Sequence, residues 1–260
     1  MKRMVLVAFL ILVLSGFSNM SKAQDDCCGV GSIFSMLVQS GIQGGYGLQQ
    51  YSAAGWNHYV DVYNEKRSET LTQKMDNFGT AMGFKIGANI IRIQQEDILF
   101  DVKLSYSWMK EINEATADLP TGGSAKREYE LKLGTFGFGF GISYVLNRNF
   151  DIKILDALVT WTSADLIDKY TDVSSSTELK LSSPESSVGG SFASGLVFYP
   201  LPPYVSIEAN VGYSLFSIDE MRFDDQSSLQ VDENTSELMT NFIDGGGLFA
   251  FIQLNVAVPF

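Results

Sequence analysis

The sequence predicts an all-β fold: an eight-stranded antiparallel up-and-down transmembrane β-barrel with one short helix in the first outer loop. Along the last stretch, Leu248–Phe260, apolar residues occupy alternate positions, as in a strand with one apolar face. The same period of two recurs in seven earlier segments. The connections between segments alternate between long and short, and no run of 18 apolar residues offers a membrane helix.

The amino terminus has the features of a secretory signal peptide over residues 1–23. Two basic residues precede an apolar run, 4–14, which is about half the length of a membrane-spanning helix. The small residues Ser21 and Ala23 lie where signal peptidase reads the chain, so cleavage is expected after Ala23. Cleavage removes three basic residues and changes the formal net charge from −12 to −15. Such an acidic protein is not expected to bind nucleic acid through its phosphates.

A periplasmic tail is expected over residues 24–40. It contains the only cysteines, Cys27 and Cys28, and no His or further Cys lies near them to complete a metal site. In an oxidising periplasm they can pair with each other or with another chain, or remain as two thiols. No motif indicates a cofactor.

The barrel is expected to fill residues 41–260. The seven strands before the last are predicted at Gly41–Tyr51, Thr80–Ile91, Ile98–Trp108, Glu128–Val145, Phe150–Thr162, Ser187–Tyr199 and Tyr204–Ser217. The alternation slips by one residue at Gly134-Thr135 and again near Leu155. We interpret the first slip as a β-bulge, because one extra residue reverses the side to which later side chains point.

The connections predict which end of the barrel faces outward. Three are short, at 92–96, 147–149 and 200–203, and four are long, at 52–79, 110–127, 163–178 and 218–241. A transmembrane barrel with both termini in the periplasm has short periplasmic turns and long outer loops. The first long loop contains aromatic residues at helical spacing, Trp56, Tyr59 and Tyr63, with Val60 between them. This helix is expected to pack on the barrel rim, or to contact the outer leaflet or a partner.

Alternation alone does not decide which face lies inside, because a soluble lipocalin-like barrel also has eight strands. Charges of both signs among small residues suit a crowded lumen. The predicted lumen charge network comprises Lys85, Asp101, Lys103, Lys132, Asp151, Lys153, Asp156 and Glu208. We expect Lys103, Lys85 and Lys153 to pair with Asp101, Asp151 and Glu208 and to close the lumen, because an eight-stranded barrel has room inside only for side chains.

Aromatic residues gather at the ends of the predicted strands. The predicted girdle comprises Trp108, Tyr144, Trp161, Tyr204 and Tyr213. Two aromatic belts are typical of proteins that meet lipid headgroups at both membrane surfaces. The apolar face is therefore expected to point outward, towards lipid.

The signal peptide, eight alternating strands, short and long loops and terminal Phe260 resemble the OmpA/OmpX-type family of small bacterial outer-membrane β-barrels. The resemblance is architectural and covers residues 41–260. It implies a location in the outer membrane of a Gram-negative bacterium, among outer-membrane lipids and lipopolysaccharide. It also implies that Phe260 is an assembly signal for the barrel assembly machinery.

Two possible chemical sites carry weak signals. The last long loop is acidic, and Asp224, Asp225, Asp232 and Glu233 are weak candidates for a Ca²⁺ or Mg²⁺ site, although their spacing matches no EF-hand. A solvated acidic loop is the favoured interpretation. His58 is the only histidine and no nucleophile motif accompanies it, so the chain is not expected to be an enzyme.

The leading functional hypothesis is an outer-membrane protein with a structural or surface-interaction role. Its outer loops, above all Trp56–Tyr63 and Asp219–Glu237, would contact lipopolysaccharide or partner proteins. The alternatives are a small porin-like channel for ions or solutes and an accessory subunit of an envelope complex.

Overall fold

The computed structural model describes residues 41–119, 122–223, 225, 227, 229 and 239–257. The predicted signal peptide, the tail with Cys27 and Cys28, and Phe260 lie outside the described residues. Within the described ranges, no helix is both long enough and apolar enough to cross a membrane.

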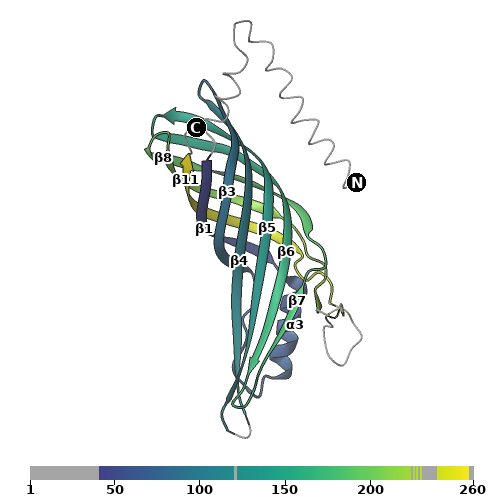
Figure 1. Cartoon of the computed structure of the whole chain (residues 1–260). Coiled ribbons are helices and arrows are strands. Elements are labelled where there is room, and N and C mark those ends of the chain that lie inside the picture. The colour runs from purple at the N-terminus through teal and green to yellow at the C-terminus, as the bar shows by residue number, and fades with distance from the viewer. Residues whose placement is uncertain are drawn as a thin grey trace. The chain divides into compact units, whose positions relative to one another are not determined.

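Eight antiparallel strands form a closed ring (Figure 1). In ring order they are β1 (Gly41–Ser52), β3 (Thr80–Gln95), β4 (Ile98–Asp118), β5 (Ser124–Asn147), β6 (Phe150–Thr171), β8 (Ser187–Leu201), β9 (Val205–Leu215) and β11 (Gly245–Ala257). The ring closes where β1 pairs with β11, with Gly41 opposite Ala257 and Gly45 opposite Gln253. Neighbours in the chain are neighbours in the ring, so the predicted eight-stranded up-and-down barrel is confirmed.

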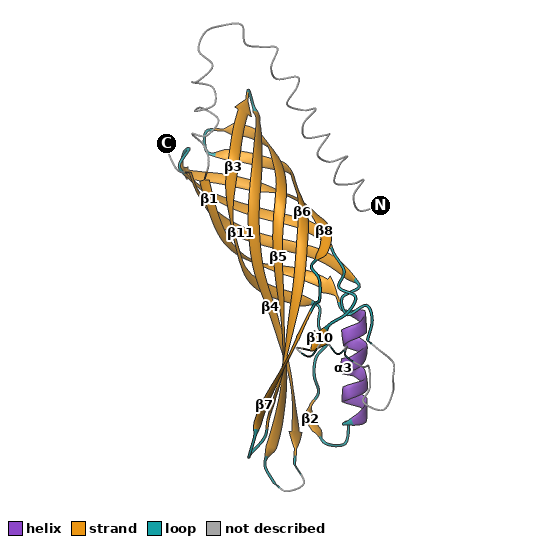
Figure 2. Cartoon of the chain, turned by 45° about the vertical axis from the view of Figure 1, so that its right-hand side comes forward, coloured by secondary structure: helices purple, strands orange, loops and turns teal. Residues whose placement is uncertain are grey.

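Three strands continue past the barrel, and this continuation of the same sheet is named here the extension (Figure 2). Its long strands are the distal parts of β4, β5 and β6, from Met109, Leu133 and Ala164 outward. Short strands complete it: β2 (Leu71–Gln73) on β4, β7 (Ser176–Ser182) on β6 and β10 (Arg222–Phe223) on β7. The predicted long loops at 110–127 and 163–178 are therefore wrong, because most of these residues are paired in strands.

The predicted bulge at Gly134-Thr135 is wrong, whereas the slip near Leu155 is confirmed. Pairing between β4 and β5 runs without interruption from Ile98 opposite Tyr144 to Asp118 opposite Ser124. The register between β5 and β6 does shift, because Ile142 lies opposite Leu155 and Ser143 opposite Lys153, which leaves Ile154 unpaired.

The apparent slip in β5 arises because the apolar side of the sheet reverses at one height. In the barrel the outer face is apolar, whereas in the extension the inner face is apolar. The change occurs along a single row of paired residues, Met109, Leu133 and Ala164, which all point inward and are buried. We name this row the inversion row.

The single described helix, α3 (Ala54–Lys66), explains why the inner face of the extension is apolar. Its residues Trp56, Val60 and Tyr63 are buried in the same hydrophobic core as Leu131 and Leu133 of β5. The predicted helix in the first outer loop is confirmed. Its start is anchored from the far end of the chain, because the Ala54 N–H donates to Asp244 Oδ1 at 3.0 Å.

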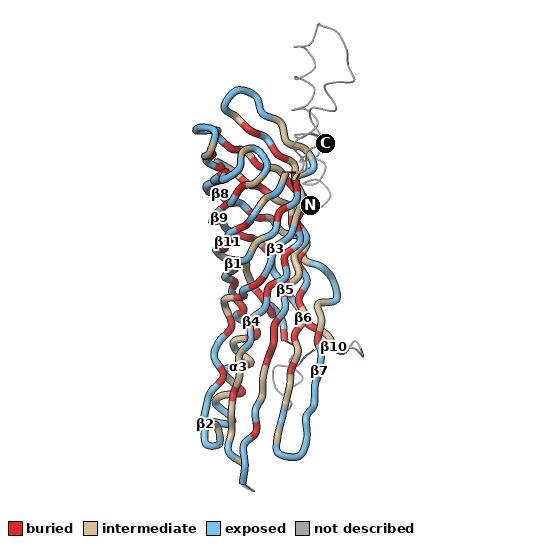
Figure 3. The backbone as a smooth tube through the Cα atoms, turned by 60° about the vertical axis from the view of Figure 1, so that its left-hand side comes forward, coloured by how far each residue is buried: buried red, intermediate tan, exposed pale blue. Residues whose placement is uncertain are grey.

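Burial alternates along every barrel strand (Figure 3). The outward side chains are mostly apolar, and the large ones that are between 38% and 66% exposed form what we name the apolar band. Its members include Ile42, Tyr46, Phe84, Ile86, Phe100, Phe138, Ile152, Ile154, Phe192, Leu196, Ile207, Val211, Ile252 and Leu254. Polar side chains point the other way, into the lumen.

Candidate functional site: the barrel lumen

The middle of the lumen is filled by a chain of ion pairs that joins three strands. The ammonium of Lys103, on β4, lies 3.1 Å from Asp101 Oδ1 and 2.7 Å from Asp156 Oδ2 on β6. Lys153, also on β6, lies 3.7 Å from Asp156 Oδ2 and contacts Glu208 on β9. All five side chains are buried, so each charge depends on its partners for the solvation that water would supply.

Glycines on β5 make space for this network. A Cβ atom at Gly141 would lie 2.6 Å from Asp101 Oδ1, and one at Gly137 would lie 3.0 Å from Ser105 Oγ. The inner face of β5 therefore lacks side chains at the height where β4 and β6 contribute charged ones. The small residues that alternate with phenylalanines in this segment thus serve the packing of the lumen.

The short-turn end of the lumen is closed by a separate contact group. The hydroxyl of Tyr199 donates to Asp151 Oδ2 at 2.6 Å, and the guanidinium of Arg92 contacts the same hydroxyl and lies 3.9 Å from that carboxylate. Asp151 thus pairs with Arg92 and not with the expected lysine. The sequence placed Arg92 in a turn, but a register shift between Asn89 and Ile91 turns its side chain inward.

Two predicted network members differ from the others. Lys132 lies on the outer face of the extension with 46% of its side chain exposed, and its partner there is Glu130 Oε1 at 3.6 Å. The prediction that Lys132 faces the lumen is wrong, because it assumed a bulge that does not exist. Lys85 does point into the lumen, but no carboxylate of the described residues lies within ion-pair distance. Its ammonium lies 5.3 Å from the ring centroid of Phe251.

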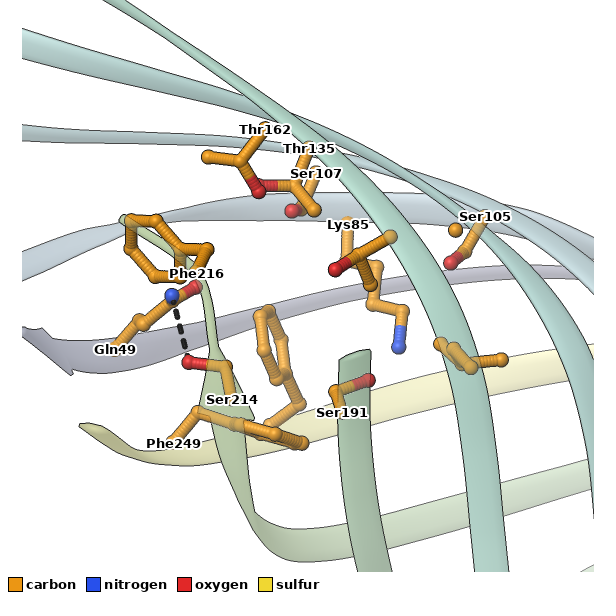
Figure 4. A pocket seen from close by; sticks show the side chains of 14 residues that line it. Gln49, Lys85, Ser105, Ser107, Thr135, Thr162, Ser191, Ser214, Phe216 and Phe249 are labelled. Carbon is orange, nitrogen blue, oxygen red and sulfur yellow. Dashed lines mark hydrogen bonds between the residues drawn. The ribbon is translucent and has the colours of Figure 1, made fainter. Parts of the chain in front are cut away.

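A small chamber of about 40 Å³ lies beside Lys85 (Figure 4). Its wall combines residues that carry hydroxyl groups, among them Ser105, Ser107, Thr135 and Thr162, with Leu158 and three phenylalanines. Gln49 Nε2 donates to Ser214 Oγ at 3.1 Å across it. This volume holds roughly two to four water molecules. The chamber therefore gives the Lys85 ammonium polar neighbours that the ion-pair network does not supply.

The loop end of the lumen is sealed by apolar side chains. Met109 and Leu133 of the inversion row, together with Phe216 and Phe249, belong to the hydrophobic core that also contains Trp56. The lumen thus has three layers between its ends: the Arg92 group, the ion-pair network and the hydroxyl chamber. Each layer is filled or enclosed by side chains, which is an arrangement suited to a closed barrel.

The aromatic residues of α3 do not form an exposed contact surface. Trp56 stacks on Tyr59 and meets Tyr129 edge-on, with ring centroids 4.9 Å apart in both pairs, and Tyr63 is buried. The expectation that Trp56, Tyr59 and Tyr63 contact a partner through an exposed aromatic face is wrong. These side chains pack inside the protein, as expected for a helix that lies on the barrel rim. His58 lies on the exposed side of the helix.

Polar contacts in the extension were missed by sequence analysis. Glu111 accepts hydrogen bonds from the Tyr51 hydroxyl at 2.6 Å and from the Thr80 N–H at 2.8 Å. Arg127 pairs with both oxygens of Asp168, at 3.0 and 2.6 Å. The residues of both contact groups lie in or beside segments that the sequence predicts to be loops.

The predicted girdle residues lie on the outer face. Trp108, Tyr144, Tyr204 and Tyr213 are between 39% and 46% exposed, and Trp161 is half-buried. Trp161 belongs to an aromatic row, because Tyr106 lies opposite Phe136 and Phe136 opposite Trp161.

Of the four acidic metal candidates, only Asp225 lies within the described residues. Its Oδ1 accepts hydrogen bonds from the N–H and the hydroxyl of Ser227, at 2.9 and 2.5 Å. These bonds lower the pKa of Asp225. Asp224, Asp232 and Glu233 lie outside the described residues.

Comparison with known proteins gives structural matches only. No family model matches the chain, and no curated protein sequence matches it. Ail, the attachment invasion locus protein of Yersinia pestis, is 13% identical, with 85% of this chain and 99% of Ail covered and a TM-score of 0.38. Neisserial surface protein A is 11% identical, with 84% and 97% covered and a TM-score of 0.32. The outer membrane protease OmpT of Escherichia coli is 10% identical, with 85% and 95% covered and a TM-score of 0.35.

Proposed function

We propose that this chain is an integral β-barrel protein of a Gram-negative outer membrane with a structural or surface-interaction role. The observation that carries the proposal is the apolar band. A closed barrel that exposes residues such as Ile42, Val211 and Ile252 to more than half of their full area would bury them only against lipid. The filled lumen supports a role other than free passage of solutes.

The outer face near the inversion row supports contact with phosphate-bearing lipids. Beyond the aromatic row, Lys110 lies directly opposite Lys132 on the neighbouring strand. Like charges at opposed positions destabilise a sheet. The Glu130 carboxylate, 3.6 Å from the Lys132 ammonium, offsets part of this repulsion, and the Lys132 side chain is still 46% exposed to a further anion. Outer-leaflet phosphates, including those of lipopolysaccharide, would meet these lysines just above the hydrocarbon, where the aromatic row meets the interface.

The extension supports a role at the outer surface. With the apolar band in the membrane, the extension and α3 project on the side of the long connections, away from Gly41 at the start of β1 and Ala257 at the end of β11. Its outer face carries cross-strand ion pairs, such as Lys126 with Glu114 at 2.5 Å and Lys169 with Glu130 at 3.3 Å. Such a charged, hydrated face suits the headgroup and saccharide region above a bilayer.

The test compares one substitution at two exposed isoleucines. Ile252 is 66% exposed in the apolar band, and Ile112 is 43% exposed on the outer face of the extension. If the band contacts lipid, Ile252→Lys lowers the free energy of unfolding in lipid vesicles by about 2–4 kcal/mol, whereas Ile112→Lys changes it by less than about 1 kcal/mol.

The wild-type chain serves as the reference for the same experiment. We expect it to refold only with detergent or lipid and to migrate faster on gels before heating than after. A stable monomer without detergent, or equal tolerance of lysine at both isoleucines, would overturn the proposal.

A further inference from the structure

A pocket of about 180 Å³ lies at the far end of the extension, between the end of α3 and the inner face of the sheet. Tyr63 and Arg67 line it from the helix side, and Arg127 and Tyr170 line it from β5 and β6. It lies apart from the lumen, and no part of the proposed membrane role uses it.

The floor of the pocket is formed by small apolar side chains of the sheet. Ala117 lies opposite Ala125, and Ala115 lies one inward position nearer the barrel. Closer to the barrel the same inner face carries Tyr129 and Leu131, which are buried in the hydrophobic core. The methyl groups at the far end of the sheet therefore leave space that larger side chains would fill.

Arg67 occupies the position at which the sheet-facing side of α3 would continue. Trp56, Val60 and Tyr63 of that side are buried, and Arg67 follows Tyr63 by four residues, which is about one helical turn. Its guanidinium accordingly lies 4.6 Å from the ring centroid of Tyr63. A cation thus lines the pocket at the position where an apolar side chain would have closed it.

The pocket carries one positive charge that no described residue balances. Arg127 also lies near the Tyr63 ring, at 5.2 Å from its centroid, but it pairs with both oxygens of Asp168. Arg67 forms no ion pair with a described residue. Asp118 is exposed and occupies an outward position of β4, so its carboxylate does not neutralise Arg67. Two guanidinium groups therefore lie near one ring, and only one of them has a carboxylate partner.

We propose that this pocket binds a small monocarboxylate with an apolar body. The carboxylate would bind Arg67, whose planar guanidinium can donate two parallel hydrogen bonds. The apolar body would lie on the alanine floor, between Tyr63 and Tyr170. One unpaired guanidinium above an apolar floor suits a single negative charge better than a doubly charged phosphate. This inference goes beyond the proposed membrane role, because binding depends on the pocket alone.

The test uses isovalerate as the probe and the three floor alanines as reporters. The full chain, folded in micelles of a nonionic detergent and labelled with ¹³C at alanine methyl groups, is titrated while the signals of Ala115, Ala117 and Ala125 are followed. We expect saturable shifts at these methyls. The methyl of Ala209, opposite Ile252 on the outer face of the barrel, reports any probe that merely dissolves in the micelle, and it should not show the same saturation.

The uncharged analogue isolates the role of the carboxylate. Isovaleramide has the same apolar body as isovalerate but no negative charge. It is expected to bind at least about tenfold more weakly, because it cannot form the charge-assisted pair with Arg67.

Variants of the pocket separate the charge from the space. Arg67→Gln is expected to weaken binding of isovalerate at least about tenfold, and Ala117→Phe to abolish it by filling the pocket. Arg148→Gln is the matched control, because it makes the same substitution at an exposed arginine in the turn between β5 and β6. It is expected to leave binding unchanged.

Three results would each overturn the inference: equal binding of isovalerate and isovaleramide, undiminished binding by folded Arg67→Gln or Ala117→Phe, or absence of saturable shifts in the folded wild-type chain. The comparison of the acid with its amide uses the wild-type protein, so it holds even if a variant fails to fold. Failure here leaves the comparison of Ile252→Lys with Ile112→Lys untouched, so the two proposals fail separately.

Discussion

The indole of Trp56 lies edge-on to the ring of Tyr129, with the centroids 4.9 Å apart and the planes at 83°. Both side chains are only 1% exposed. This contact joins α3 to β5, the middle strand of the extension. The aromatic side of the helix in the first outer loop therefore packs against the extension and stabilises it.

Trp56→Ala is expected to release α3 from the extension, because truncation of a buried tryptophan typically costs about 3–5 kcal/mol. Amide hydrogen exchange along α3 and the distal part of β5 should accelerate, while exchange in the barrel strands stays slow. His58→Ala, on the exposed side of the same helix, is the control. Equal protection of α3 in both variants would contradict the supporting role of Trp56.

Glu111→Ala is expected to lower the free energy of unfolding of the extension by about 3 kcal/mol. The change removes acceptors for the Tyr51 hydroxyl and for the N–H groups of Gly79 and Thr80. Tyr51→Phe removes only one of these bonds and should cost about 1 kcal/mol. Denaturant unfolding in micelles measures both, and similar losses would show that the backbone bonds to Glu111 contribute little.

Lys103→Met is expected to destabilise the barrel by about 3–5 kcal/mol, because it leaves Asp101 and Asp156 as buried carboxylates short of a partner. Lys132→Met, which removes a half-exposed lysine from the extension, should cost less than about 1 kcal/mol. Unfolding by guanidinium chloride in micelles compares the two. The wild-type barrel should also give no stable porin-sized conductance in planar bilayers, and such conductance would refute the closed lumen.

The anchoring of α3 by Asp244 is expected to depend on pH. The hydrogen bond from the Ala54 N–H lowers the pKa of Asp244, so the carboxylate favours the folded helix start when it is ionised. This contribution is fully present above the unfolded pKa of about 3.9 and is lost as pH falls through the lower folded value. Protection factors at the first turn of α3, which correct for the intrinsic pH dependence of amide exchange, should therefore fall with acid below about pH 4 in the wild type. Asp244→Asn should remove that dependence, and an identical profile in both proteins would exclude Asp244 as its source.

Lys110→Gln combined with Lys132→Gln is expected to weaken the stabilisation of the barrel by lipopolysaccharide, because both lysines would face outer-leaflet phosphates. The melting temperature in micelles, measured with increasing lipopolysaccharide, reports this binding. Lys180→Gln, which removes a half-exposed lysine further along the extension, serves as the control. A titration curve unchanged by the double substitution would exclude these lysines as the phosphate contact.

The barrel could be predicted from the sequence because its strands follow one consistent pattern, in which apolar residues point outward and polar residues point inward. The extension could not, because this pattern reverses at the inversion row while the strands run on. In the sequence that reversal looks like an added residue at Gly134-Thr135, and this interpretation placed Lys132 on the wrong face. Near Leu155 the same kind of signal came from a real register shift, and there it was interpreted correctly.

The lumen residues other than Lys132 could be assigned to the inner face from alternation, but their partners could not. Pairing depends on which side chains share a height across strands, as Lys103 and Asp156 do. It also depends on small irregularities, because the register shift near Asn89 brings Arg92 to Asp151.

In the proposed membrane orientation, the residues on either side of the inversion row would fix how deep the protein sits in the bilayer. Sinking by one row towards the cell would drag Lys110 and Lys132 into hydrocarbon, while rising by one row would lift Trp161 and its aromatic neighbours into water. Both movements, inward and outward, are therefore opposed by residues of the same three strands, β4, β5 and β6. In that orientation the barrel would be held at a single depth, and the far end of the extension would keep a constant height above the bilayer.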